Sequence, residues 1–396
     1  MDKGSDFKKI IAFIVSKGNH PALHRNSLEI AKGFESLGCD VEFTYLNDPA
    51  AMQIAYDLMR SEQVWFSIGV NDTGAFLQTA PEHYALGDLP VPYVSVLLDA
   101  PYNAANGNLG FPCQKHYLWV LDKSHVGAVK YRFPEKQFAG EIFQPLGGDV
   151  ATHEDEIFSI DRDLDVVFSA SMFEDGNIKM YWREQTDNPY IIGILDDVVE
   201  YMLANPVSLL PAVRYVLEDK GLIGEQYVEA LAPYFHGVFF YVKMLRRYRT
   251  LEEVTKKDIH VDVFGPGWKN VPFANKLNIH GAVSYDTVLD AFSRAKVVVQ
   301  DQAEFNNGGH DRVFTAMLNG AVVVSEYSSY LDKEFDDGSD IFLFDWKNVG
   351  QQMNVVDELL LDESKRLASA IRAYGKAKAK HRWENRAQRV LEMMSL

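Results

Sequence analysis

Short apolar runs alternate with amphipathic segments along the first half of the chain. Lys9 to Val15 is compact, apolar and rich in β-branched residues, which is typical of a strand buried in a parallel sheet. After a polar loop, Asn26 and Glu29 have the spacing of a capping box, and apolar residues then recur at helical spacing as far as Gly38. The pattern therefore predicts a strand, a loop and a helix that begins near Asn26.

The same rhythm continues toward residue 150, so this half is expected to form a parallel sheet covered by helices. Its further strands are expected at Val41–Tyr45, Val64–Ile68, Tyr93–Leu98 and Tyr117–Leu121. The segment Thr152–Asp165 is acidic and contains few apolar residues. It is predicted to link this domain to a second one.

Strand-like runs return in the second half, where a long helix-rich block interrupts them. These strands are expected at Val166–Ala170, Ile259–Phe264, Leu277–His280, Lys296–Gln300 and Ala321–Ser325. Between the first two, residues 180–255 are helical in pattern, and their aromatic residues indicate either internal packing or a dimer interface. We therefore expect an α/β protein with one domain at residues 1–155, a second at 156–380 that contains this helical insertion, and a carboxy-terminal helix at 381–396 that packs back on the first domain.

Composition narrows the class of protein. A chain of 396 residues with 47% hydrophobic and 24% charged residues suits two ordinary globular domains. The stretch before Ile10 is polar and no apolar run is long enough to span a membrane, so we expect a cytoplasmic protein. Cys39 and Cys113 lie in no metal-binding pattern and are expected to be small apolar fillers.

The net charge of −17 argues against nucleic acid as a partner, because phosphate binding needs an excess of Lys and Arg. One stretch differs: residues 365–389 carry nine Lys or Arg and a single acid, Glu384. A solvated helix face explains this stretch. The alternative is contact with an anionic membrane surface or an acidic partner.

The loop DQAEFNNGGHDR at residues 301–312 is the most informative stretch for chemistry. It joins a buried strand to a helix, at the sheet edge where open α/β sheets bind ligands. Asn307 and Gly309 let a ligand approach the backbone, while His310 and Arg312 stand in the first helical turn, where positive charge opposes the helix dipole. An anion such as a diphosphate would explain that placement. The alternative is that Arg312 pairs with a carboxylate and His310 is an ordinary loop residue.

Two further segments belong to the same edge of the second sheet. In FGPGW at 264–268, Gly265 and Gly267 permit tight approach to a ligand. In NIHGAVS at 278–284, a strand end runs into a helix start, where a nucleotide base has backbone to lie against. Gly320 is expected to end the helix that follows Arg312.

As an ordered set, these segments resemble a known family. FGPGW, NIHGAVSYDTVLDAFSRAKVVVQ, HDRVFTAMLNGAVVVSEYSSYL, FDDGSDIFLFD and RWENRAQRVL are similar to the carboxy-terminal domain of CgeB-like glycosyltransferases, of the spore-maturation-protein type, over about residues 259–391. PYVSVLLDAPYN, YLWVLDKSHVGAVK and FQPLGGD are similar to the domain that accompanies it. The resemblance implies the GT-B architecture, in which two Rossmann-like domains face each other across a cleft. It also implies a nucleotide-sugar donor on the second domain and a protein, glycan or other hydroxyl acceptor.

The donor side is expected to comprise the residues that match the family and the loop residues beside them. They are Gly265, Gly267, Trp268, His280, Gly281, Asn307, Gly309, His310, Arg312 and Thr315. One position departs from the family, because related transferases place a Glu where this chain has Thr315 and use it to bind the donor ribose. Either Thr315 forms a weaker hydrogen bond, or other residues hold the ribose, or donor use has changed.

A catalytic base is expected from the first domain, because the acceptor hydroxyl must lose a proton as it attacks the sugar. His20 and His24 follow the first strand and Asp99 follows another, so all three are candidates. A structural role is equally open for each of them, and the sequence leaves inverting and retaining chemistry open.

No metal or cofactor is expected. Asp161, Asp163 and Asp165 alternate as in a DxD metal site, but they lie in the linker and not at a strand end, so they are interpreted as solvated charges. The helix end with His310 and Arg312 would neutralise a leaving diphosphate instead.

The function predicted from the sequence is therefore metal-independent glycosyl transfer from a nucleotide-sugar, of the hexosyltransferase type. The alternative is a non-catalytic nucleotide-sugar-binding or assembly protein on the same fold. Turnover of nucleotide-sugars separates the two.

Overall fold

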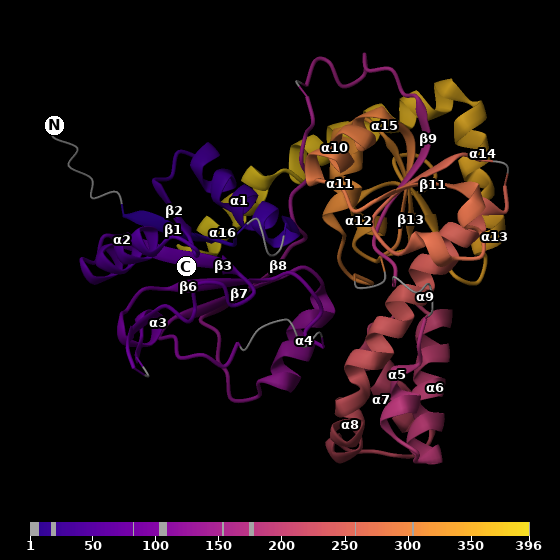
Figure 1. The fold of residues 1–396 in the computed structure, drawn as a ribbon. Coiled ribbons are helices and arrows are strands. Elements are labelled where there is room, and N and C mark those ends of the chain that lie inside the picture. Colours follow the sequence, from indigo (N-terminus) through magenta and orange to yellow (C-terminus); the bar gives the residue numbers. More distant parts are fainter. Residues whose placement is uncertain are drawn as a thin grey trace. The chain divides into compact units, whose positions relative to one another are not determined.

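The computed structural model describes residues 8–16, 21–81, 83–102, 109–152, 154–173, 178–257, 259–302 and 305–395. The chain forms two compact units (Figure 1). Unit 1 comprises Met1–Gly147 and His381–Leu396, and unit 2 comprises Gly148–Lys380. Each unit is built around a parallel sheet of six strands with helices on both faces.

The sheet of unit 1 has the strand order β2-β1-β3-β6-β7-β8. Its strands are β1 (Lys9–Ile14), β2 (Val41–Tyr45), β3 (Val64–Val70), β6 (Tyr93–Leu97), β7 (His116–Val120) and β8 (Gly140–Phe143). A small hairpin of β4 (Gln78–Ala80) and β5 (His83–Tyr84) lies outside this sheet. The strand Lys9–Val15 and the next four strands predicted from the sequence are all present, to within two residues at either end.

Helices cover both faces of this sheet. They are α1 (Pro21–Ser36), α2 (Pro49–Arg60), α3 (Ala85–Asp88), α4 (Lys123–Arg132) and α16 (Trp383–Met394). The last helix, α16, packs against α1, where a Cβ added to Gly33 would lie 2.8 Å from the carbonyl oxygen of Trp383. The predicted start of α1 near Asn26 is wrong. The helix begins five residues earlier at Pro21, a residue whose fixed φ suits the first helical position.

The sheet of unit 2 has the order β11-β10-β9-β12-β13-β14, in which the direction of strand addition reverses between β9 and β12. Its strands are β9 (Leu164–Ser169), β10 (Val261–Phe264), β11 (Leu277–Gly281), β12 (Ala295–Gln300), β13 (Val322–Glu326) and β14 (Phe342–Phe344). Val297–Val299 and Val322–Val324 are buried on both faces, which explains their unbroken apolar runs. Open α/β sheets bind ligands at such a reversal, outside the carboxyl ends of the strands.

Helices lie on both faces of this sheet as well. They are α9 (Phe235–Thr255), α10 (Tyr285–Arg294), α11 (Asp311–Leu318), α12 (Leu331–Glu334), α13 (Val349–Gln352), α14 (Asn354–Leu361) and α15 (Glu363–Lys380). Side chains of α9 and α14 pack on one face, and those of α10, α11 and α15 on the other. Gly320 follows α11 with a φ of 73°, so its predicted role in ending that helix is confirmed.

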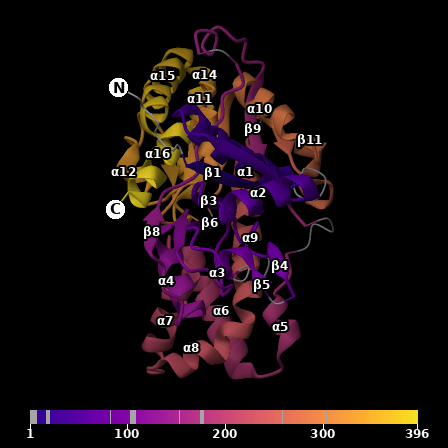
Figure 2. The same ribbon diagram turned by 90° about the vertical axis from the view of Figure 1, so that its left-hand side faces the viewer.

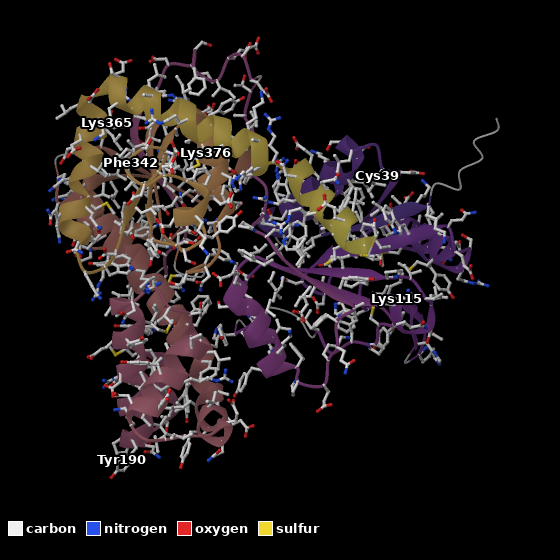
Figure 3. The ribbon with its side chains drawn as sticks, turned by 180° about the vertical axis from the view of Figure 1, so that it is seen from behind. Cys39, Lys115, Tyr190, Phe342, Lys365 and Lys376 are labelled. Atoms are coloured by element: carbon white, nitrogen blue, oxygen red, sulfur yellow. The ribbon has the colours of Figure 1, made fainter. Side chains whose placement is uncertain are left out.

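The helical insertion forms a bundle that projects from this sheet, as the two views in Figures 1 and 2 show. It contains α5 (Tyr181–Gln185), α6 (Pro189–Ala204), α7 (Leu209–Asp219), α8 (Glu225–Leu231) and the first part of α9. Phe235, Phe239 and Tyr241 are buried inside it, so these aromatic residues pack the bundle. Tyr190, which is 83% exposed, marks its far end in Figure 3.

The acidic segment Thr152–Asp165, which was predicted to be a linker, is part of unit 2. The backbone N–H of Asp149 donates to Thr315 Oγ1 at 3.2 Å, and that of Ala151 donates to Asn319 Oδ1 at 2.8 Å. Further along, Asp163 pairs with Arg294, and Asp165 pairs with Lys296 at 2.6 Å. These contacts explain why the division between the units falls after Gly147 and not near residue 155.

The basic stretch of α15 is largely neutralised within unit 2. Lys365 pairs with Glu358 at 2.9 Å, Lys376 with Asp336 at 2.7 Å, and Lys380 with Glu334 at 3.4 Å. Lys365 and Lys376 are labelled on this helix in Figure 3. Through the described part of the chain, no helix combines the length and the apolar composition needed to cross a membrane.

Candidate functional site

Three loops meet at the carboxyl edge of the unit 2 sheet. The segment after β9 runs beside the segment after β10, since Ala170 N–H donates to Phe264 O at 2.9 Å and Met172 N–H donates to Pro266 O at 2.8 Å. The third loop follows β12, the neighbour of β9 across the reversal point. The candidate donor residues therefore lie around the expected ligand-binding edge of one sheet.

The two glycines of FGPGW are required by the neighbouring backbone. Gly265 has a φ of 135°, and a Cβ there would lie 2.2 Å from Ala170 O. Gly267 has a φ of 91°, and its Cβ would lie 2.1 Å from Met172 O. Any other residue would force the two loops apart. The protein's own backbone therefore requires these glycines, and their approach to a ligand stays a prediction.

Trp268 is a structural residue, contrary to the prediction that it contacts the donor. Its side chain is fully buried and its Nε1–H donates to Ala170 O at 2.7 Å. Its ring meets Phe168 edge to face, with centroids 5.7 Å apart. Trp268 therefore fixes the loop from within the core and has no surface to offer a ligand.

A hollow of about 290 Å³ lies beside this loop. It is lined by Gly265, Pro266, Gly267, Lys269, Asn270, Ile279, Gly281 and Ala282. Much of its wall is glycine backbone, so peptide groups and flat surface are available to a ring. Two of the lining residues pair through their backbones, since Gly265 N–H donates to Gly281 O at 2.8 Å.

His280 does not line this hollow. Its Nε2 lies 2.7 Å from Asp262 Oδ1, and its ring stacks on Phe264 with centroids 4.2 Å apart. Asn278 donates to the same carboxylate at 2.6 Å. The side chain of His280 is thus held against β10, and the prediction that it contacts the donor is not supported by its position. Ile279 and Gly281, on either side of it, line the hollow instead.

A cluster of basic residues surrounds Asp301, the first residue after β12. Asp301 is 3% exposed, and its Oδ1 lies 3.4 Å from Arg247 Nε and 3.7 Å from Arg312 Nη2. Burial alone would raise the pKa of Asp301. Arg247, Arg312, His310 and Lys243 outweigh burial and hold that pKa at about 2. Arg247, Arg312 and Lys243 outnumber the two carboxylates, Asp301 and Asp311, so the cluster retains net positive charge.

The two guanidiniums of this cluster are anchored but not saturated. Arg312 Nε donates to Gln300 Oε1 at 2.7 Å, and Arg247 Nη1 donates to Ser171 O at 2.6 Å. Among the described residues, Arg312 Nη2, Arg247 Nε and Asp301 Oδ1 have no hydrogen-bond partner, although their side chains are largely buried. These atoms face one another in the ion pairs with Asp301, but without hydrogen-bond geometry. Because buried donors normally find partners, an anion that accepts from both arginines would supply the hydrogen bonds that these pairs lack.

His310 stands at the amino end of α11, immediately before Asp311. Its Nδ1 lies against the Asp311 carboxylate, which requires a proton on that nitrogen. The 3.4 Å approach of Arg312 N–H to the same nitrogen is then no hydrogen bond. Burial and the charge of Arg312 lower the pKa of His310, and Asp311 and Asp301 offset this in part. His310 N–H donates to Gln302 Oε1 at 3.0 Å and so fixes the loop.

Arg247 and Lys243 were not predicted from the sequence. They lie on one face of α9, four residues apart, at the point where the helical insertion returns to the sheet. The signal in the sequence was the charge of Arg246 and Arg247 directly after the largely apolar run from Val238 to Leu245. Arg246 is fully buried and reaches Asn306 Oδ1 at 3.1 Å and Glu326 Oε1 at 3.0 Å.

The remaining loop residues shape the site. Asn307 Oδ1 accepts from Ser329 Oγ at 2.9 Å, and a Cβ on Gly309 would lie 3.0 Å from Phe314. Thr315 is 2% exposed, and its hydroxyl oxygen accepts from Asp149 N–H. Thr315 is therefore occupied by the protein's own backbone.

The catalytic candidates belong to unit 1. His20 lies outside the described residues. His24 lies in the first turn of α1, not in a loop, and its Nδ1 lies 2.7 Å from Val15 O. Because a carbonyl only accepts, Nδ1 carries the proton, and Nε2 is the basic nitrogen of the neutral ring. Asp99 follows β6, two strands from β1 in the sheet, which corresponds to about 10 Å.

His125 accompanies Asp99 at this edge and was also missed. It is buried in α4, and burial lowers its pKa, while Asp122 and Asp99 act in the opposite direction. Asp122 starts α4 by accepting from Ser124 N–H at 2.8 Å. The motif YLWVLDKSHVGAVK contains both residues, so the signal lay in a segment already noted for its resemblance.

Solved structures with this architecture exist. An α-glucosyltransferase in complex with UDP-glucose and DNA containing an abasic site aligns with a TM-score of 0.55 at 12% identity, over 98% of this chain and 99% of that one. A DNA-modifying β-glucosyltransferase gives 0.51 at 10% identity, over 98% and 100%. Anabaena Alr3699/HepE in complex with UDP-glucose gives 0.50 at 12% identity, over 98% and 99%. The chain has the GT-B fold.

Sequence comparison adds a family match to the GT-B fold. Residues 246–392 match the family described as glycosyl transferase-like. This segment begins at Arg246, and it contains every donor-side residue predicted above. No curated protein sequence matches the chain. Within the ranges that the structure describes, no three His, Cys, Asp or Glu side chains converge as they would to hold a metal ion.

Proposed function

We propose that this GT-B protein is a glycosyltransferase that moves a sugar from a nucleotide-sugar donor to a hydroxyl acceptor. The observation that carries this proposal is the basic cluster around Asp301, placed at the strand reversal of unit 2 together with the hollow beside Gly265 and Gly281. A nucleotide-sugar presents a flat base and a diphosphate, which are the two features that these sites suit.

The base would occupy the hollow, against the backbone of Gly281 and Ala282. The diphosphate would lie at the start of α11 and accept hydrogen bonds from Arg312 and Arg247. As the bond between the sugar and the β-phosphate oxygen breaks, negative charge develops on the diphosphate. Preorganised arginines stabilise that charge without reorganisation, and we propose that no metal ion is needed.

His24 is our first candidate for the catalytic base in unit 1. Its Nδ1–H is held by Val15 O, so Nε2 has a lone pair to take the proton from the acceptor hydroxyl as that oxygen bonds to the sugar. Asp99 is the second candidate, with the buried His125 beside it to orient the carboxylate. His20 stays a candidate on sequence grounds alone.

The acceptor is proposed to be a protein or a glycan. DNA appears in the descriptions of two neighbouring structures, but the net charge of −17 opposes a nucleic-acid acceptor here. The resemblance to the CgeB-like type and transfer of a hexose are part of the same proposal, as is action in the cytoplasm. Because α15 is internally paired, a solvated helix face is favoured over a membrane or acidic partner for residues 365–389.

The first test is a thermal-shift panel of nucleotide-sugars and nucleoside diphosphates, followed by hydrolysis of the best donor without acceptor, with and without EDTA. We expect one nucleotide class to raise the melting temperature, and slow hydrolysis that persists in EDTA. Binding without any turnover would support a non-catalytic binding protein instead. Loss of turnover in EDTA that Mg²⁺ or Mn²⁺ restores would contradict the metal-free part of the proposal.

The base is tested separately by His24→Ala, His20→Ala and Asp99→Asn. At least one variant is expected to lose about 100-fold or more in turnover with the true acceptor while donor affinity is retained. Full turnover in all three would place the base elsewhere.

A further inference from the structure

Tyr285, Asp149, Thr315 and Asn319 form a hydrogen-bonded group in unit 2. The Tyr285 hydroxyl donates to an Asp149 carboxylate oxygen, and the Asp149 N–H donates to Thr315 Oγ1 at 3.2 Å. Asn319 Nδ2 donates to Asp149 O at 2.9 Å. Asp149 is 5% exposed. Hydrogen bonds therefore hold Asp149 in place through both its backbone and its carboxylate.

The position of this group follows from its neighbours in the chain. Tyr285 begins α10, three residues after Ala282 at the rim of the hollow. It also interacts electrostatically with Asp311 and Arg312, which begin α11. Burial, then Asp149 and Asp311, raise the pKa of Tyr285 well above its usual value, and Tyr285 in turn affects the pKa of Arg312. Tyr285 and Asp149 thus stand between the proposed base site and the proposed diphosphate site.

In a nucleotide, the ribose joins the base to the diphosphate. We infer that Asp149 and Tyr285 form the ribose subsite, with the Asp149 carboxylate accepting from a ribose hydroxyl and the Tyr285 hydroxyl as its second polar contact. This inference rests on the proposed function. It assigns the donor to the ribonucleotide class, because a site built to bond a hydroxyl discriminates against the analogue that lacks it.

The small side chain of Thr315 is what makes room for this arrangement. A Cβ added to Gly148 would lie 2.7 Å from Phe314 C and 2.8 Å from Thr315 N, so the chain before Asp149 runs directly over α11. A longer side chain at position 315 would occupy the space of the Asp149 backbone. Asp149 therefore supplies the carboxylate at this place, and the hydroxyl oxygen of Thr315 accepts a hydrogen bond from the Asp149 backbone N–H.

The test compares ribonucleotides with their deoxy counterparts by calorimetry. UDP, GDP, ADP and CDP are screened first on the wild-type protein, and the tightest binder is then compared with its 2′-deoxy and 3′-deoxy forms. The wild type is expected to bind the ribonucleotide at least about 10-fold more tightly than one of the two deoxy forms, as for a hydrogen bond to a charged group.

The variants are Asp149→Asn and Tyr285→Phe, which keep the shape of each side chain. Asp149→Asn should lose most of the discrimination, and Tyr285→Phe at least half of it, with deoxynucleotide affinity nearly unchanged. Asp286→Asn, the exposed neighbouring carboxylate on α10, is the matched control and should keep the full ratio. A ratio of affinities is used because general loss of folding would weaken both ligands equally.

The outcomes separate the two proposals. If no ribonucleoside diphosphate binds the wild type, the proposed function is contradicted, and the ribose subsite with it. If one binds but its deoxy forms bind equally well, or if Asp149→Asn keeps the full ratio, the ribose subsite is overturned and the proposed function stands.

Discussion

Replacing Arg312 by alanine is the most direct test of the basic cluster. The guanidinium is 18% exposed and its Nε is held by Gln300 at 2.7 Å. Its Nη2 lies 3.7 Å from Asp301 Oδ1 and has no hydrogen-bond partner within the described residues. It is therefore preorganised for a ligand. A hydrogen bond to a charged group contributes about 1.5–3 kcal/mol, so we expect nucleoside diphosphate affinity to fall about 10- to 150-fold. Asp301 keeps Arg247 at 3.4 Å, so the variant should still fold.

The assay is calorimetric titration with the nucleoside diphosphate that stabilises the wild type most. Arg294→Ala is the matched control, since it also removes an arginine from unit 2 but one that pairs with Asp163 and Asp290 on the surface. Melting temperatures of both free variants show whether folding has been affected. If Arg312→Ala binds within twofold of the control, the diphosphate does not contact Arg312, and the reasoning from the unsaturated guanidinium is wrong.

Three further variants test other parts of the structure. Asp301→Asn should lower the melting temperature of the free protein, because two buried guanidiniums lose their counter-charge, yet tighten diphosphate binding; weaker binding in calorimetry would contradict this. Burial lowers the pKa of His116 to about 3 in the folded protein, so the unfolded chain binds a proton at this histidine more readily. The contribution of neutral His116 to the free energy of unfolding is therefore fully present above pH 6.5 and is lost as the pH falls toward 3. In urea unfolding, the free energy of unfolding should fall between pH 7 and pH 5 by about 2 kcal/mol less in His116→Gln than in the wild type. Equal losses in the two proteins would refute this role of His116. Trp268→Phe should cost about 1–3 kcal/mol in urea unfolding at pH 7, by leaving Ala170 O without its donor; an unchanged midpoint would count against the structural role of Trp268.

The central strands could be predicted from the sequence because burial on both faces leaves an unbroken apolar run. Val297–Val299 and Val322–Val324 are such runs, and both lie where expected. β8 and β14 were missed for the opposite reason. They are the last strands of their sheets and are four and three residues long; the side chains of β8 are also only partly buried. An edge strand of this length carries too little pattern to distinguish it from a loop.

The site was predictable only where its residues follow a strand directly. His310 and Arg312 come after β12, so topology alone placed them at the binding edge. Arg247 and Lys243 reach the same cluster from α9, more than 50 residues earlier in the chain. The helices α5 to α8 of the insertion separate α9 from the strand β9 that precedes them. The local sequence pattern of a helix does not predict which loop its charged face will contact. That information exists only in the packing of α9 on the sheet.

Glycine-rich loops illustrate a different limit. A glycine permits close approach equally to a ligand and to the protein's own backbone, and the two requirements look identical in sequence. In FGPGW, packing against Ala170 and Met172 already demands both glycines, before any ligand is considered. The same loop also lines the hollow, because two chains pressed together with no side chains between them leave bare peptide groups exposed beside the contact. The structural need for glycine thus creates the kind of surface on which a base could rest.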